Sequence, residues 1–74
     1  MTARKFEARE AVVGQHVLTN DGCYGEVLAV HPIPTGYLNI RLLVTKIGRK
    51  ALRRPMRMTH TIRRDGSLYI KETA

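Results

Sequence analysis

Apolar and polar residues alternate with a period of two through most of the chain after Gly14. This alternation is typical of β-strands that bury one face. It predicts strands over residues 16–19, 26–31, 37–45 and 56–63, and a last short strand around 68–70. In the clearest run we expect one buried face, formed by Leu38, Ile40, Leu42 and Val44, with Tyr37, Asn39, Arg41 and Thr45 on the other.

Turn residues separate these runs. Asn20, Asp21 and Gly22 form a polar turn, because each either tolerates a positive φ or hydrogen-bonds its own backbone. Pro32 and Pro34 lack amide donors, so we expect the second strand to end there.

The turn at Asp65-Gly66 allows two registers. A two-residue loop would place Leu68 and Ile70 on the polar face of the preceding strand. A three-residue loop pairs Ile62 with Leu68 and reunites the apolar residues. We therefore expect a hairpin with the second register, with Gly66 in the left-handed conformation.

The first thirteen residues contain mostly helix-forming residues after Thr2, but their apolar residues form no clear stripe. We interpret residues 1–13 as a short helical or flexible segment and residues 14–74 as one β-domain. Lys46 to Arg54 is expected to be a basic loop that ends at Pro55. Five short strands joined in this way predict a mainly β fold, a closed or nearly closed antiparallel barrel.

Size and composition restrict the interpretation further. A chain of 74 residues forms one domain with a single core. Its one cysteine cannot form an internal disulfide, and the sequence contains neither a secretory signal nor a membrane-spanning run. These features favour a cytoplasmic protein.

Positive charge is concentrated in one segment. The formal net charge is +7, and residues 46–64 contain eight basic residues and no acidic one. Such a segment repels itself unless it binds a polyanion or an acidic partner, although a solvated loop that maintains solubility is the simpler alternative. The candidate binding residues are Lys46, Arg49, Lys50, Arg53, Arg54, Arg57, Arg63 and Arg64, together with Tyr37.

Catalytic chemistry is sparse in the sequence. The six carboxylates form no evident acid–base pair, and neither Ser67 nor Cys23 belongs to a motif that activates a nucleophile. The three histidines lie far apart, and His60 falls on a predicted inward face, where a hydrogen-bonded core histidine is expected. We therefore expect no enzyme, metal site, cofactor or small-molecule substrate.

Tyrosines are the aromatic residues best suited to binding. Tyr24, Tyr37 and Tyr69 could stack on unpaired bases, or they could cover the rim of the core with their hydroxyls in water. The sequence lacks the aromatic series that sequence-specific RNA binding requires.

The stretch VGQHVLTNDGCYGEVLAVHPIPTGYLNIRLLV resembles the KOW type of SH3-like barrel found in transcription elongation factors and ribosomal proteins. The matching features are the start at Gly14, the Asp21-Gly22 turn, Gly25-Glu26-Val27 and the return strand after Gly36. The same residues, with the strand Asp65 to Ile70, are also similar to a PRC-barrel. Both resemblances imply a small barrel, and the KOW resemblance implies work beside RNA, RNA polymerase or the ribosome.

A free-standing basic barrel of this size also resembles the compact regulators that phages direct at host RNA polymerase. The sequence thus favours a non-enzymatic protein of transcription that binds RNA or DNA, RNA polymerase, or both. The alternative is a protein-interaction module whose arginines meet an acidic protein surface. A structural component of a particle is a third reading.

Overall fold

The computed structural model describes residues 2–72 of the chain and the side chains of residues 4–70. Within this range the chain forms a single antiparallel sheet of six strands, in the order β1-β6-β2-β3-β4-β5. The elements are β1 (Thr2–Glu7), the 3₁₀ turn η1 (Ala8–Glu10), β2 (His16–Leu18), β3 (Cys23–Pro32), β4 (Tyr37–Ile47), β5 (Lys50–Arg63) and β6 (Ser67–Glu72).

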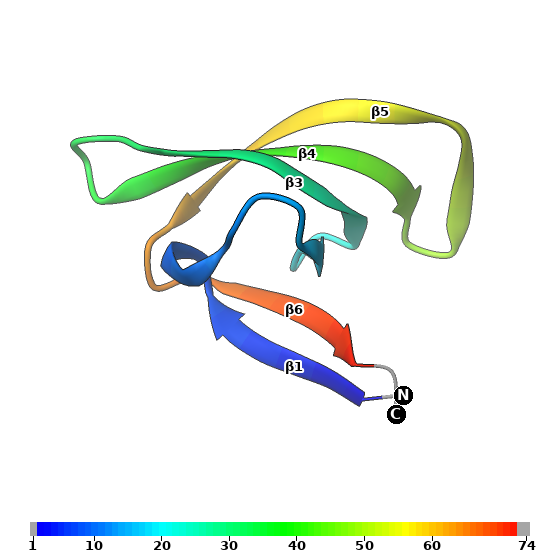
Figure 1. Ribbon diagram of the computed structural model, residues 1–74, viewed down its shortest axis with the longest axis horizontal. Coiled ribbons are helices and arrows are strands. Elements are labelled where there is room, and N and C mark those ends of the chain that lie inside the picture. Colours follow the sequence, from blue (N-terminus) through cyan, green and yellow to red (C-terminus); the bar gives the residue numbers. More distant parts are fainter. Residues whose placement is uncertain (1, 73–74) are drawn as a thin grey trace.

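The sheet curves strongly, so that two groups of strands face each other. Figure 1 shows β3, β4 and β5 arching over β1 and β6. The short strand β2 joins the two groups, because it pairs with β3 on one side and with β6 on the other. The core lies between them and consists of Ala8, Ala11, Val17, Cys23, Val27, Leu38, Ile40, Leu42, Val44 and Leu68.

The alternation predicted for residues 37–45 is confirmed in β4. All four residues expected on its inner face are buried. The inner and outer faces of the neighbouring strand β5 are aligned with those of β4, because Met58 pairs with Leu42 and Ile62 pairs with Leu38. Met58 and Ile62 pack against the core, so the outward residues of β4 and β5 share one solvent-facing surface.

The N-terminal segment, expected to be short and either helical or flexible, is mostly strand. Thr2–Glu7 forms strand β1, which pairs with β6 along its whole length, and only Ala8–Glu10 is helical, as one 3₁₀ turn. β6 offers a free hydrogen-bonding edge to this segment, and Phe6 packs against the core. These tertiary interactions override a helix propensity of a few tenths of a kcal/mol per residue. The sheet therefore has six strands rather than the expected five.

The hairpin predicted at Asp65-Gly66 does not form. Within residues 2–72, β5 pairs with β4 alone, whereas β6 pairs with β1 and β2. The turn carries a hydrogen bond from Gly66 N to Arg63 O at 2.8 Å, and Gly66 is not among the glycines with positive φ. β6 satisfies its backbone groups with β1 and β2, so its register is set by these two strands and not by β5.

The expected basic loop over residues 46–54 is mostly strand. β4 continues to Ile47, Gly48 and Arg49 form a tight turn, and β5 begins at Lys50. Residues 52–55 form a bulge, because Val44 pairs with Met56 while Lys46 pairs with Ala51. Pro55 is tolerated in this strand since the bulge lies on an edge, where its missing N–H breaks no ladder hydrogen bond.

The sheet does not close into a barrel in the described part of the chain. β1 and β5 are its two edges, and no ladder joins them. No helix among residues 2–72 is long and apolar enough to cross a membrane.

Candidate functional site

Five of the eight predicted basic residues gather where β4 turns into β5. Arg49 lies in the turn, Lys50 begins β5, and Arg53 and Arg54 lie in the bulge; all four are exposed. A hydrogen bond from Gly48 N to Gly22 O, at 2.8 Å, fixes this turn against the turn between β2 and β3. We call Lys46, Arg49, Lys50, Arg53 and Arg54 the basic hairpin end.

Arg63, Arg64 and Tyr37 lie at the other end of β5, away from the basic hairpin end. Arg63 closes β5 and Arg64 follows in the turn, where its N–H donates to Gly36 O at 3.2 Å. Tyr37 pairs with Arg63 across the ladder and is 39% exposed. The structure therefore distributes the predicted site residues over β5, its adjoining turns and the two ends of β4 rather than in one loop.

Two arginines on the outer face, Arg41 and Arg57, lie between the basic hairpin end and the Arg63–Arg64 end of β5. Arg57 pairs with Leu43, and Arg41 pairs with Thr59, two residues further along the ladder. Both arginines are exposed, and such diagonal neighbours on two adjacent strands lie about 7–8 Å apart on one face. Arg41 belongs to the same surface but was absent from the predicted set, although the alternation in β4 had placed it outward.

This positive charge is almost unneutralised by the protein itself. Among the side chains of residues 4–70, Arg63 is the one member of the predicted basic set with a carboxylate at ion-pair distance. Its Nε lies 3.4 Å from Asp65 Oδ1, and both side chains are about 70% exposed, so the pair contributes little. Glu26 is the acidic residue of the outer face, in the row of Leu43 and Arg57.

A second cluster of chemically reactive groups lies on the other side of the hairpin. Asp21 from the β2–β3 turn, Cys23 at the start of β3 and His60 from β5 each place one ligand atom within 4.8 Å of the others. His60 Nε2 lies 3.3 Å from Asp21 Oδ2, which links β5 to a turn that it does not pair with.

Thr19 organises this cluster. Its hydroxyl donates a short hydrogen bond to Asp21 Oδ1 and accepts one from the Cys23 N–H at 3.1 Å. The Thr19 bond, with a smaller contribution from the His60 charge, lowers the pKa of Asp21 although burial opposes it. Burial, followed by the neighbouring Asp21 charge, raises the pKa of the Cys23 thiol. The carboxyl group is therefore ionised at neutral pH and the thiol is protonated.

Sequence reasoning did not foresee this cluster. His60 was expected to be a satisfied core histidine, yet its Nδ1 is buried without a hydrogen-bond partner. The available signals were a polar residue among the inward-facing residues of β5 and an Asp-x-Cys spacing in a turn. Neither signal shows that residues 21 and 60 meet, because that depends on the curvature of the sheet.

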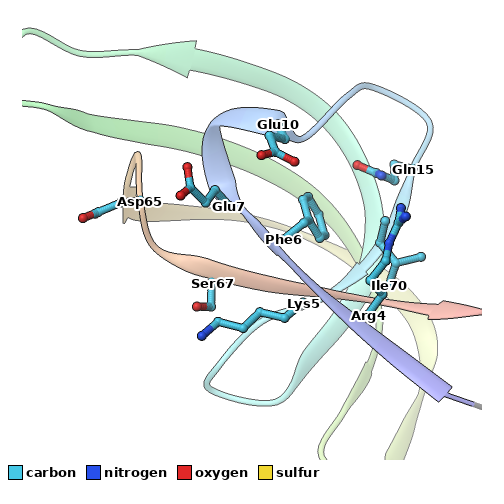
Figure 2. A pocket seen from close by; sticks show the side chains of 9 residues that line it. All are labelled: Arg4, Lys5, Phe6, Glu7, Glu10, Gln15, Asp65, Ser67 and Ile70. Atoms are coloured by element: carbon cyan, nitrogen blue, oxygen red, sulfur yellow. The ribbon is translucent and has the colours of Figure 1, made fainter.

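A pocket of about 560 Å³ lies beside β1. Figure 2 shows Glu7 and Glu10 on one side of the Phe6 ring and Gln15 and Arg4 on the other. Arg9 Nε contacts Glu7 Oε2 at 2.5 Å without hydrogen-bond geometry. The lining mixes both charges and holds no histidine or cysteine; it consists of Arg4, Lys5, Phe6, Glu7, Glu10, Gln15, Asp65, Ser67 and Ile70.

Comparisons of the chain with protein-family models, with curated proteins and with solved structures find no match.

Proposed function

We propose that this protein is a non-enzymatic β-domain that binds nucleic acid through the basic hairpin end and the outer face of β4 and β5. The observation that carries the proposal is the largely unneutralised charge along β5 and its adjoining turns: seven of the eight basic residues are exposed, and one of the eight contacts a described carboxylate. Arginine and lysine side chains in this state neutralise phosphates and release condensed counterions, which drives binding.

Tyrosines beside these cations support single-stranded nucleic acid as the ligand. Tyr37 faces outward next to Arg63, and Tyr24 lies in the same cross-strand row as Lys46. An aromatic ring next to a phosphate-binding cation is the arrangement that lets a protein hold a strand by its backbone while stacking a base. Such contacts do not depend on base identity, so we expect weak sequence preference.

The proposal extends to the fold family and the cellular process. Strands β2 to β6 correspond to an SH3-like barrel of the KOW type, to which β1 adds a sixth strand. The pairing of the last strand, β6, with the first strand of this unit, β2, supports that assignment. The resemblance implies a role in transcription beside RNA polymerase in the cytoplasm, as in the compact phage regulators.

Fluorescence anisotropy tests nucleic-acid binding directly. Labelled single-stranded RNA, single-stranded DNA and duplex DNA are titrated with the protein from low to physiological salt. We expect a complex whose log affinity falls with log salt at a slope of about 3 or more, since each phosphate contact contributes about 0.7 for a single strand. The variant Arg53→Gln/Arg54→Gln should lower that slope by about 1.4.

A matched variant controls for the loss of net charge. Arg4→Gln/Lys5→Gln also removes two cations, but from β1, which lies across the core from β5. It should leave affinity and slope near those of the unaltered protein. Equal losses in both variants would mean that only net charge matters, and no binding to any of the three probes at physiological salt would refute the proposal.

An acidic protein surface is the second candidate ligand, and the free edge of β5 favours it. Within residues 2–72 this strand pairs with β4 alone, so its other edge can accept an extended acidic segment by strand addition. A partner that stays bound after nuclease treatment, and that is lost on charge reversal of Arg53 and Arg54, would establish this alternative.

A further inference from the structure

The gap between β5 and the β2–β3 turn contains three metal-ligating side chains that the sequence keeps far apart. Asp21 and Cys23 lie on the turn and the start of β3, whereas His60 lies on the inner face of β5. One ligand atom of each residue lies within 4.8 Å of the other two. The three supply oxygen, sulfur and nitrogen, a mixed donor set that suits Zn²⁺ and related divalent ions.

The spacing of these atoms is close to that of a bound ion. Ligands about 2.0–2.3 Å from a tetrahedral zinc ion lie about 3.3–3.6 Å from one another. His60 Nε2 and Asp21 Oδ2 already lie 3.3 Å apart. The Cys23 sulfur therefore needs a shift of little more than 1 Å at most to complete the third side of the site.

Outer-shell contacts hold two of the ligands in place. The Thr19 hydroxyl donates to Asp21 Oδ1, which leaves Oδ2 directed at His60, and accepts the N–H of Cys23. Such contacts orient ligands and raise metal affinity. A pocket of about 190 Å³, lined by residues that include Asp21 and His60, leaves room for water as a fourth ligand.

Without an ion, this arrangement has little stabilising value. The Asp21 side chain is 63% exposed, so its pairing with His60 contributes little. The group is therefore poorly explained as a structural ion pair.

We propose that Asp21, Cys23 and His60 bind one divalent transition-metal ion of the zinc class, with water in the fourth position. The ion would fasten β5, an edge strand of the sheet, to the β2–β3 turn across the gap that no ladder closes. Binding displaces the thiol proton of Cys23, since the thiolate is the ligand. None of the three residues belongs to the basic set along β5, so the site does not depend on the proposed nucleic-acid binding.

Cobalt titration of the full chain tests the site. The reduced protein is treated with a chelator, desalted and titrated with Co²⁺ while the absorption spectrum is recorded. We expect one Co²⁺ per chain, with a thiolate-to-cobalt charge-transfer band and the intense visible bands of a tetrahedral ion. Zn²⁺ should abolish both features by displacement and should raise the melting temperature, because it binds the folded chain preferentially.

Variants assign the ligands. Cys23→Ser should remove the charge-transfer band, and His60→Gln and Asp21→Asn should each weaken Co²⁺ by more than the 10- to 100-fold typical of losing an outer-shell partner. His31→Gln is the matched control, since His31 is exposed on the outer face of β3. Circular dichroism confirms that each variant is folded.

Two results would overturn the proposal. One is a folded wild-type protein that shows no thiolate band and no rise in melting temperature with saturating metal. The other is Co²⁺ affinity that is the same in His60→Gln as in His31→Gln. Because His60→Gln leaves the buried Cys23 in place, the test stands even where Cys23→Ser fails to fold.

Discussion

Gly25 lies opposite Val44 in the β3–β4 ladder, next to an irregularity in that pairing. A Cβ atom built at this position would lie 2.3 Å from Leu43 O and 2.8 Å from Val44 Cα. Both are backbone atoms of the adjacent strand and cannot rotate away. The two strands approach this closely only because residue 25 has no side chain.

Gly25→Ala should therefore destabilise the protein by at least about 2 kcal/mol, because β4 has to move away from β3 at the centre of the sheet. Urea or thermal unfolding measures the change. Glu26→Ala, at the next residue and on the outer face, should change the free energy of unfolding far less. Similar stabilities of the two variants would show that the close approach to Leu43 is not a constraint.

At the level of elements, β1 and β5 are the two edge strands of the sheet, and different features protect each of them from pairing with another chain. β1 has its inner residue Phe6 packed against the core, and its backbone pairs with β6. β5 carries arginines, Pro55 and a bulge, devices that discourage edge-to-edge aggregation. A basic edge of this kind repels a second copy of the same strand while remaining open to an acidic ligand.

Phe6→Ala tests how firmly β1 belongs to the sheet. Since full burial of a phenylalanine is worth about 3–5 kcal/mol and Phe6 is half-buried, we expect a loss of about 2 kcal/mol. Hydrogen exchange should become faster at the amides that join β1 to β6. Lys5→Ala, the exposed neighbour, serves as the control, and unchanged exchange in Phe6→Ala would mean that Phe6 does not anchor β1.

On the scale of the whole molecule, charge is distributed unevenly. The basic residues follow β5 from the 48–49 turn to the 64–65 turn, whereas the pocket beside β1 is lined by Glu7, Glu10 and Asp65 together with Arg4 and Lys5. Like charges along one strand raise the free energy of the folded state at low ionic strength. A bound polyanion or dissolved salt relieves this repulsion.

The melting temperature should therefore rise as salt is added from a few millimolar to physiological concentration, over which the screening length falls to about 8 Å. Differential scanning calorimetry records the change. Arg53→Gln/Arg54→Gln should show a smaller rise than the unaltered protein. A melting temperature that falls with added salt would indicate that favourable ion pairs, rather than repulsion, dominate.

The sequence by itself determined the central part of each strand after Gly14 and the faces of β4, but not the strand within residues 46–54. Side chains on a strand alternate whatever lies beyond it, so the buried residues of β4 and the inward residues of β5 were predictable from period alone. The location of the positive charge was also predictable, because the basic residues can be counted directly along the sequence. The continuation of β5 through Pro55 was not predictable from the sequence. A bulge with a proline is acceptable there only because β5 is an edge strand, and the sequence does not show that it is one.

Only the tertiary structure decided which strands pair and which side chains meet. Residues 2–7 became a strand because β6 had an edge to offer, and β6 took β1 and β2 as neighbours instead of β5. The curvature of the sheet then brought His60 to Asp21 and Cys23. These outcomes depend on contacts between residues far apart in the chain, and a local pattern of hydrophobicity carries no information about them.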